Sequence, residues 1–381
     1  MKYMLIAGEA SGDIHAAQVI RELRHRDKGA SFIFFGGDMM AEAAGIRPFV
    51  HYRDMAYMGF SEVIRNLGKI NANLKSARRL LRMWEPDALI LVDYPSFNLK
   101  VAAEAKKLGI PVFYYISPKV WAWKEWRVPT LKKLVTRMYS ILPFEVDWYR
   151  KNHQWNVKYV GNPSVEEMEH ALRHAPSRAD FLKEHKLRDR PIIALLPGSR
   201  LGEIKNNLEI MNKAVEQFPQ YRGVVAGAPG VDPEFYRAYT SLPVLHGCTT
   251  DLLANARAAI VTSGTATLET ALAGVPQVVC YRSNGSKIAY NVMKRVLSVD
   301  HVTLPNLITD STIIPEMLMH QCTPDAVAEQ LTPLLRDTPA RRAMLEGYKR
   351  MRALLTDASP SKAVADDIIA TLKRIKRHLV K

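Results

Sequence analysis

Short apolar runs alternate with longer stretches of helical pattern along the whole chain. The runs are apolar throughout rather than at every second residue, which is typical of parallel strands buried on both faces of a sheet. Strands separated by helices indicate α/β domains with helices on both sides of each sheet. The predicted strands are Tyr3–Ala7, Ser31–Phe35, Ala88–Val92, Val112–Ile116 and Met138–Leu142 in the first half, and Ile192–Leu196, Gly223–Ala226, Ala258–Thr262 and Gln277–Tyr281 in the second.

The strands form two sets, and 381 residues are too many for one ordinary core. A strand ends near Gly161-Asn162-Pro163, where a charged helical stretch begins, so we place the domain boundary there. We therefore predict two doubly wound parallel-sheet domains, residues 1–162 and 163–339, with ligands at the carboxyl ends of the strands. The helices of about 340–381 are candidates to pack back onto the first domain.

Composition narrows the class of protein. With 48% hydrophobic and 24% charged residues, the chain is globular rather than disordered. Its net charge of +15 suits nucleic acid, an anionic membrane surface or anionic substrates. Basic residues gather at 78–82 and 373–381, but no nucleic-acid-binding module accompanies them, so nucleic acid is the weaker interpretation. Three widely spaced cysteines without metal-ligand spacing are typical of a reducing cytosol.

Two segments bear on contact with membranes. Residues 258–281 carry one charge, but Thr, Ser, Gly and Pro divide them into strand, turn, helix and strand, which favours a buried α/β unit over a membrane span. The chain begins at a predicted strand with no room for a signal peptide, so we expect any membrane contact to be peripheral. The apolar segment Met55–Phe60 precedes a basic stretch, which makes Met58 and Phe60 candidates for lipid contact, with core packing as the equal alternative.

Two turns in the second half predict a diphosphate site. Gly198-Ser199-Arg200 follows one apolar run, and Ser263-Gly264-Thr265 follows another. Small residues at strand-to-helix turns let backbone N–H groups approach an anion, and arginine adds a fixed cationic fork. Glu269 shares a helix face with Thr265, within reach of a ribose. Either turn alone is explained equally well as an ordinary Gly- and Ser-containing turn of an α/β protein. The presence of both turns favours a diphosphate-binding site.

A further turn, Gly8-Glu9-Ala10-Ser11-Gly12-Asp13, follows the first predicted strand. It lacks the third glycine of a dinucleotide fingerprint and the lysine of a P-loop, which argues against NAD and ATP hydrolysis. The glycines allow close approach of a substrate, and Glu9 or Asp13 could bind sugar hydroxyls. A tight turn with a helix-capping acid explains the segment equally well.

Asp93 ends the apolar run Ala88–Val92, at the tip of a strand that we expect to be central. A carboxylate there lies where open sheets place ligands, and it could accept a proton from an attacking hydroxyl. A loop-fixing or N-cap aspartate is the equal alternative. Asn306, in a loop bounded by Pro305, and the Trp- and Lys-rich segment 117–124 are weaker candidates. No His/Cys/Asp cluster indicates a metal.

Taken in order, these motifs resemble the lipid-A-disaccharide synthase family of inverting glycosyltransferases. The resemblance runs from near residue 3 to past residue 320 and rests on Gly8–Asp13, Val92–Asn98, Ser117–Trp123, Leu195–Arg200 with Glu203, Ser263–Glu269 and Leu304–Leu307. It implies two Rossmann-like domains of the GT-B type with the active site in the cleft between them. Ala10 stands where the family often has Thr, and Lys119 where it often has Ser.

The resemblance also implies a reaction, in which UDP-2,3-diacylglucosamine and 2,3-diacylglucosamine 1-phosphate (lipid X) yield a β-1,6-linked disaccharide and UDP. Asp93 is then the general base, and Arg200 neutralises charge on the departing diphosphate. No cofactor or divalent metal is needed. The remaining implied contacts are Ser199, Ser263, Gly264, Thr265, Glu269 and Asn306 to UDP, and Gly8, Glu9, Ser11, Asp13, Met58 and Phe60 to the acceptor and its acyl chains.

The implied location is the cytoplasmic face of the bacterial inner membrane, with peripheral attachment; a homo-oligomer is left open. A UDP-sugar 2-epimerase of the same architecture is the nearest alternative, because it would capture UDP in a similar way. A non-enzymatic basic scaffold for membrane or RNA would explain the charge but would leave Arg200 and Glu269 without a role.

Overall fold

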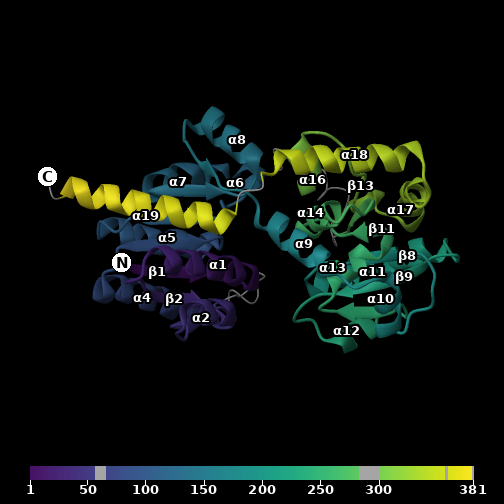
Figure 1. The fold of residues 1–381 in the computed structure, drawn as a ribbon, viewed down its shortest axis with the longest axis horizontal. Helices are drawn as coiled ribbons and strands as arrows, with labels where there is room; N and C mark the ends of the chain where they lie inside the picture. The colour runs from purple at the N-terminus through teal and green to yellow at the C-terminus, as the bar shows by residue number, and fades with distance from the viewer. Residues whose placement is uncertain (56–65, 283–300, 357–358, 380–381) are drawn as a thin grey trace. The chain divides into compact units, whose positions relative to one another are not determined.

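The computed structural model describes residues 1–55, 66–282, 301–356 and 359–379, so Met58 and Phe60 lie outside the described residues (Figure 1). The chain forms two compact units. The first comprises Met1–Pro163 together with the segment from residue 357 onward, and the second comprises Ser164–Thr356.

The first unit is built on a seven-stranded sheet in the order β3-β2-β1-β4-β5-β6-β7. Every strand pair in it is parallel. The winding direction reverses between β1 and β4, which is the switch point of a doubly wound sheet. The strands are β1 (Lys2–Ala7), β2 (Ser31–Gly36), β3 (Val50–His51), β4 (Ala88–Val92), β5 (Val112–Tyr115), β6 (Arg137–Ser140) and β7 (Lys158–Tyr159).

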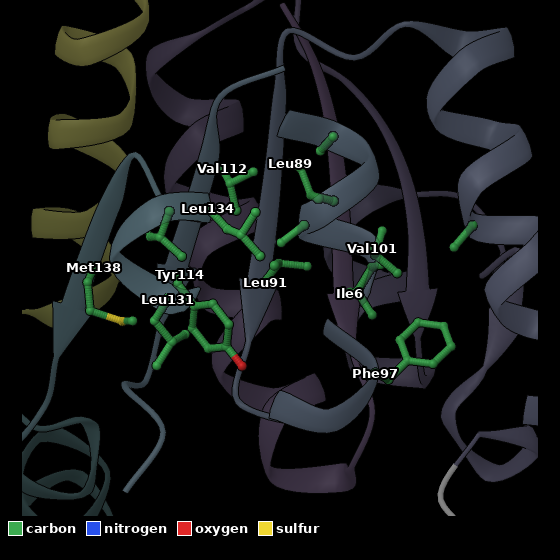
Figure 2. Close-up of a cluster of buried hydrophobic side chains, with 14 of the residues drawn as sticks. Ile6, Leu89, Leu91, Phe97, Val101, Val112, Tyr114, Leu131, Leu134 and Met138 are labelled. Atoms are coloured by element: carbon green, nitrogen blue, oxygen red, sulfur yellow. The ribbon is translucent and has the colours of Figure 1, made fainter. Parts of the chain in front are cut away.

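Helices bury both faces of this sheet. Alternate residues of β4 enter different cores: Leu89 and Leu91 pack with α5 and α7 (Figure 2), whereas Ile90 packs on the side of α1 and α19. This two-sided burial explains why the strands are apolar throughout. The helices are α1 (Ala10–Arg26), α2 (Asp38–Ala44), α4 (Leu67–Trp84), α5 (Pro95–Lys107), α6 (Val120–Trp123), α7 (Val128–Leu134), α8 (Pro143–His153) and α19 (Pro360–Leu379), with 3-10 turns η1 (Tyr52–Asp54) and η2 (Glu125–Arg127).

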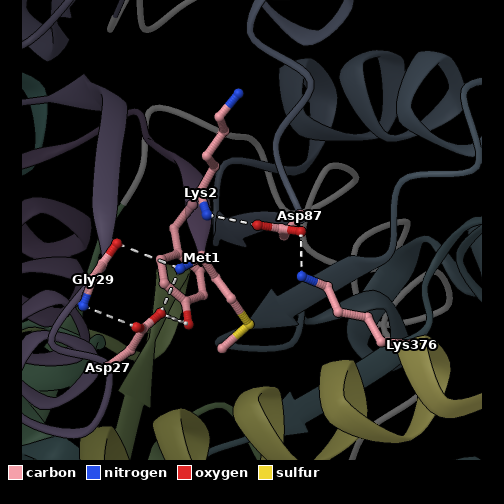
Figure 3. A network of polar contacts seen from close by, with 7 residues as sticks. Met1, Lys2, Asp27, Gly29, Asp87 and Lys376 are labelled. Atoms are coloured by element: carbon pink, nitrogen blue, oxygen red, sulfur yellow. Dashed lines mark hydrogen bonds and ion pairs between the residues drawn. The ribbon is translucent and has the colours of Figure 1, made fainter.

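The helix α19 packs against α1, so segments far apart in sequence lie side by side in the first unit (Figure 1). Polar contacts reinforce this packing (Figure 3). Asp87 accepts a hydrogen bond from the backbone N–H of Lys2 at 2.8 Å and pairs with Lys376 Nζ of α19 at 2.9 Å. Nearer the N-terminus of α19, Asp367 accepts from the hydroxyl of Tyr139 at 2.8 Å.

The second unit contains a six-stranded parallel sheet in the order β10-β9-β8-β11-β12-β13, with its switch point between β8 and β11. Its strands are β8 (Ile192–Leu196), β9 (Arg222–Gly227), β10 (Val244–His246), β11 (Ala256–Val261), β12 (Gln277–Tyr281) and β13 (Glu316–Leu318). Its helices are α9 (Pro163–Arg173), α10 (Arg178–Glu184), α11 (Leu201–Glu216), α12 (Pro233–Arg237), α13 (Thr249–Ala254), α14 (Thr265–Leu272), α16 (Leu304–Thr309), α17 (Pro324–Leu331) and α18 (Pro339–Leu354), with 3-10 turns η3 (Met319–Gln321) and η4 (Thr332–Leu334).

The predicted fold class, two doubly wound parallel-sheet domains, is confirmed. The C-terminal helices separate: α19 packs on α1 of the first unit, whereas α18 packs on α14 and α16 of the second. The expectation that residues from about 340 pack back onto the first domain therefore does not hold for α18. Its inner face supplies Met344 and Tyr348, whose hydroxyl donates to the carbonyl of Val275, and these contacts bind it to the second unit.

Across the described ranges, no helix is long and apolar enough to cross a membrane. The structure also brings together two cysteines that lie far apart in sequence. Cys280 of β12 and Cys322 are buried free thiols whose Sγ atoms are 2.8 Å apart.

Candidate active site

In each unit, several of the predicted site residues lie at the switch point of the sheet. In the first unit, Gly8 follows β1 and Asp93 follows β4, and the register pairs Ala7 with Val92 directly before them. In the second, residues 197–200 follow β8 and residues 262–265 follow β11, where the N–H of Thr262 donates to the carbonyl of Leu196 at 2.8 Å. Both locations are where open α/β sheets bind ligands.

The backbone at Asp93 is strained and firmly held. Asp93 and Tyr94 adopt φ values of 44° and 47°, a left-handed conformation that non-glycine residues rarely adopt. Two side chains fix the Asp93 carbonyl: the hydroxyl of Tyr114 donates to it at 2.6 Å, and the side-chain amide of Asn98 at 2.7 Å. Such strain persists only where surrounding contacts impose it, and it is concentrated at functional sites.

The Asp93 carboxyl is exposed on its unit, yet the surrounding atoms still reduce its hydration. This desolvation raises the pKa of Asp93 above its ordinary value, while the positive charge of Lys119 and, more weakly, His15 act in the opposite direction. A carboxylate with a raised pKa is a stronger base than an ordinary aspartate.

Gly8 has a packing reason for being glycine. A Cβ built on Gly8 would lie 2.4 Å from ring atoms of Tyr94, the residue after Asp93. The Tyr94 hydroxyl in turn donates to the carbonyl of Met55 at 2.8 Å. Of the other acceptor-side candidates, Ser11 is exposed in the first turn of α1 and Glu9 is half-buried at its N-cap position.

Asp13 has a structural role that corrects its prediction as a sugar ligand. Its carboxylate is buried and accepts hydrogen bonds from the N–H groups of Gly37, Met39 and Met40, at 2.6, 3.0 and 3.2 Å. It therefore caps the N-terminus of α2, and not the helix that its own turn opens. Since these donors occupy the carboxylate, Asp13 is not available to a substrate in this structure.

A carboxylate of the chain itself contacts the first of the two turns that the sequence predicts to bind an anion. Glu203, in the first turn of α11, accepts from the Ser199 N–H at 3.2 Å and pairs with Arg200 Nη1 at 3.4 Å. The Arg200 side chain is 65% exposed. Arg200 occupies the N-cap position of α11.

The second turn leads into α14 from β11. Gly264, at the N-cap position, has φ 157° and ψ −162°, a conformation that essentially only glycine adopts. Gly264 and Thr265 are exposed, and the hydroxyl of the half-buried Ser263 donates to the carbonyl of Val302 at 3.4 Å. The N–H groups that open α14 at this turn are suited to an anion.

Glu269 lies one turn into α14, four residues after Thr265, and is half-buried. Desolvation raises the pKa of its carboxyl, and the like charge of Glu167 on α9 raises it further. A carboxyl in such surroundings is stabilised by a partner that donates hydrogen bonds.

Asn306 also has a structural role that corrects its prediction as a UDP ligand. Its side chain is fully buried in α16. The amide donates to the Ile314 carbonyl and to Glu316 Oε1, and its oxygen accepts from the N–H groups of Ile313 and Ile314, all at 2.9 Å. With all of these bonds made within the chain, Asn306 fixes the segment before β13 and presents nothing to a ligand.

The predicted lipid-contact segment is only partly described. Met55 is buried, so it belongs to the core of the first unit, and its exposure as a lipid contact is ruled out. The basic helix α4 that follows buries Leu74, Ala77 and Leu81 and exposes Lys75, Arg79 and Met83 among others. Among the residues with a described position, no group of three or more His, Cys, Asp or Glu side chains is arranged to hold a metal ion.

Sequence reasoning missed two residues near Asp93. Tyr114, which fixes the Asp93 carbonyl, lies within an apolar predicted strand, so nothing in the sequence singled it out. Glu145, buried in the first turn of α8, accepts from Trp121 Nε1 at 2.8 Å and contacts the hydroxyl of Ser140. Burial raises the pKa of Glu145 to about 7, because desolvation outweighs these hydrogen bonds and the Lys119 charge.

Two parallel sheets of Rossmann strand order, with candidate residues at each switch point, are the fold of the GT-B-type glycosyltransferases and sugar-nucleotide epimerases. Solved structures share this fold at 12 to 17% sequence identity. They include a UDP-GlcNAc 2-epimerase from Neisseria meningitidis bound to UDP-GlcNAc (TM-score 0.64, 14% identity, 98% of this chain and 100% of that one). The calicheamicin glycosyltransferase CalG4 is also similar (TM-score 0.60, 17% identity, 98% of each chain).

Comparison with sequence relatives shows to which family within this fold class the chain belongs. The family model for lipid-A-disaccharide synthetase matches residues 3–368. Lipid-A-disaccharide synthases of Myxococcus xanthus and Syntrophus aciditrophicus are 37% and 36% identical, over 97% and 92% of both chains. This chain belongs to the lipid-A-disaccharide synthase family and is a glycosyltransferase of lipid A biosynthesis; its likeness to the epimerases is one of fold alone.

Proposed function

We propose that the protein joins UDP-2,3-diacylglucosamine to 2,3-diacylglucosamine 1-phosphate (lipid X), forming the β-1,6-linked disaccharide and releasing UDP. One observation carries the proposal. In a chain of this family, a strained, desolvated aspartate lies at one switch point, and two glycine-containing strand-to-helix turns, to which we assign the diphosphate, lie at the other.

In the proposed reaction, Asp93 accepts the proton of the acceptor 6-hydroxyl. The hydroxyl oxygen forms a bond to the anomeric carbon of the donor, the bond from that carbon to the diphosphate breaks, and UDP leaves with the electron pair. Attack opposite the leaving group inverts the anomeric configuration. Two features of the site support Asp93 as the base: its raised pKa, and the hydrogen bonds from Tyr114 and Asn98 that hold its backbone.

The UDP half of the proposal assigns the diphosphate to the Ser199–Arg200 and Ser263–Thr265 turns. Glu203 supports this assignment, because its carboxylate already occupies the Ser199 N–H and the Arg200 guanidinium as an anion would. We infer that the diphosphate takes over both donors. Arg200 then offsets the negative charge that develops on the leaving group. Glu269, whose environment favours a hydrogen-bond donor, binds the ribose hydroxyls.

Both proposed substrates are acylated, so we also propose peripheral attachment to the inner membrane at its cytoplasmic face. The exposed Lys75, Arg79 and Met83 of α4 support this surface. Flotation with vesicles of phosphatidylglycerol should recover the protein at low salt and less of it at high salt. Charge reversal of Lys75 and Arg79 should reduce the recovered fraction; equal recovery would exclude α4 as the attachment site.

The decisive assay incubates the protein with UDP-2,3-diacylglucosamine, with and without lipid X. Acceptor-dependent release of UDP supports the proposal. Isomerisation of the sugar without acceptor would favour an epimerase, and neither reaction would favour a scaffold. Asp93→Asn should retain UDP binding and lose transfer; transfer by this variant at the wild-type rate would place the base elsewhere.

A further inference from the structure

Side chains on one face of α8 form hydrogen bonds with the segment that leads from β5 to α6. Glu145 and Tyr149 lie four residues apart and therefore on the same side of the helix. The Tyr149 hydroxyl is 2.9 Å from Ser117 Oγ at the start of the segment, and Glu145 accepts from Trp121 Nε1 at its end. We call Glu145 and Tyr149 the α8 clamp. Lys119, between its two attachment points, is exposed.

The clamp is rigid because its polar groups are buried. Ser117, Trp121, Glu145 and Tyr149 are each at most 5% exposed. Buried polar groups are costly unless they are hydrogen-bonded, so motion of the segment would leave these groups unsatisfied. Phe144 adds an edge-to-face contact with Trp121, with ring centroids 5.0 Å apart. The clamp therefore fixes the backbone that carries Lys119.

The same segment lies beside Asp93. β4 and β5 are neighbours, and the Asp93 N–H donates to the carbonyl of Tyr115 at 3.1 Å, two residues before Ser117. The Lys119 ammonium and the Asp93 carboxylate interact electrostatically, which lowers the pKa of Asp93 and opposes its desolvation.

Other elements also act on this carboxylate. His15 from α1 lowers the pKa of Asp93, but less than Lys119 does. From α8, Glu145 and Asp93 are like charges when both are ionised, and this interaction contributes to the raised pKa of Glu145. The Tyr114 phenol on β5 is neutral, because burial holds its pKa well above the usual range. Of the two positively charged side chains that lower the pKa of Asp93, Lys119 therefore has the larger effect.

We propose that Lys119 is a positioning residue of the transfer reaction: from a backbone held by the α8 clamp, its ammonium keeps Asp93 ionised and ready to accept a proton. This inference rests on the proposed role of Asp93 as the base. The inference concerns a feature of this chain in particular, because Lys119 stands where the lipid-A-disaccharide synthase family often has serine. That serine also makes Lys119→Ser a variant that we expect to fold.

The test measures kcat/KM for disaccharide formation from pH 5 to 9, with tryptophan fluorescence at each pH to verify folding. Activity should fall on the acidic side as Asp93 becomes protonated. In Lys119→Ser, the midpoint of this fall should move upward by about half to one pH unit. The rate at the acidic end should then drop about three- to tenfold, while the rate above pH 8 changes less than twofold.

Two variants control for charge and for general damage. Lys119→Arg should restore the wild-type midpoint. Lys133→Ser removes an exposed lysine of α7 that is not among the charges acting on Asp93, and it should leave the midpoint in place. An unmoved midpoint in Lys119→Ser, or an equal loss of rate at every pH, would overturn the proposal.

The role of the clamp is tested separately. Tyr149→Phe removes the hydroxyl that holds Ser117, and it should move the midpoint in the same direction as Lys119→Ser but by less. If Lys119→Ser moves the midpoint and Tyr149→Phe does not, the clamp is not what positions the lysine. If Asp93→Asn instead transfers normally, the proposed base fails, an outcome distinct from either of these.

Discussion

Replacing Glu145 by glutamine should change how the stability of the first unit depends on pH. Burial raises the pKa of Glu145 from 4.5 to about 7 in the folded protein. Because folding then favours the protonated acid, the stabilisation is complete below pH 4.5 and is lost as the pH rises toward 7. Glutamine is a neutral mimic that does not titrate.

The hydrogen-bond geometry agrees with a protonated Glu145. The Ser140 hydroxyl lies 2.9 Å from the Leu142 carbonyl and also contacts Glu145. A hydroxyl has one proton, so it cannot donate to both acceptors. A proton on Glu145 resolves the conflict, because the acid then donates to Ser140 while Ser140 donates to Leu142.

The size of the effect follows from the two pKa values. One pKa unit is worth about 1.4 kcal/mol, and titration of a single group with these values costs the folded state about 2.5 kcal/mol between pH 5 and pH 8. Relative to wild type, Glu145→Gln should therefore be about 2.5 kcal/mol more stable at pH 8 than at pH 5. The comparison between variants cancels the other titrating groups.

Urea unfolding followed by tryptophan fluorescence provides the assay. All six tryptophans lie between residues 84 and 155, so the signal reports on the first unit. Glu42→Gln, at a carboxyl whose side chain is 72% exposed, serves as the matched control and should show no such pH dependence. A stability difference between Glu145→Gln and wild type that is equal at pH 5 and pH 8 would refute the reasoning.

Three other substitutions have defined outcomes. Gly8→Ala would push a methyl group into the Tyr94 ring and should destabilise the first unit by about 1–3 kcal/mol in urea unfolding, whereas Gly29→Ala, whose Cβ would lie at an ordinary contact distance of 3.8 Å from Asp27 Oδ1, should be nearly neutral. Arg200→Ala should lower kcat about a hundredfold in the UDP-release assay without changing the unfolding midpoint, because its side chain is mostly exposed; turnover close to normal would remove it from the mechanism. Asp367→Asn should cost about 2 kcal/mol at pH 7. Desolvation opposes the lowered pKa of Asp367, but its hydrogen-bond donors prevail, so this cost should shrink as the pH falls below 3.8; a constant cost would contradict the assignment.

The sequence predicted the central strands and missed the edges. All nine strands expected from apolar runs are present. Among the residues that the structure describes, the four strands that were missed, β3, β7, β10 and β13, form the two edges of each sheet. An edge strand has one neighbour and is only partly covered, so it is short and needs no continuous apolar run. The burial patterns of these four strands contain only half-buried and exposed residues.

The candidate site shows where one-dimensional reasoning ends. The ends of the strands could be predicted from the sequence, because an apolar run marks where a strand stops. Asp93 and Arg200 follow such runs. Hydrogen-bond partners were not, because they come from distant segments. Asp13 and Asn306 were predicted to bind ligands. In the structure, backbone N–H groups more than 20 residues away donate hydrogen bonds to the Asp13 carboxylate. The side chain of Asn306 is hydrogen-bonded to the segment that leads into β13 and to Glu316 within it. Glu145 gave no signal, because only the fold buries it.

The placement of α19 has a consequence for biosynthesis. The second unit is continuous in sequence, whereas the first is interrupted by it and is completed by α19. A ribosome therefore delivers every residue of the second unit before it delivers the helix that covers α1. During that interval the α1 side of the first sheet lacks Val364, Ala365, Ile368 and Leu372, leaving an apolar surface open in the nascent protein. Ribosome-bound chains stalled just before α19 should accordingly recruit a chaperone to the nearly finished amino-terminal half.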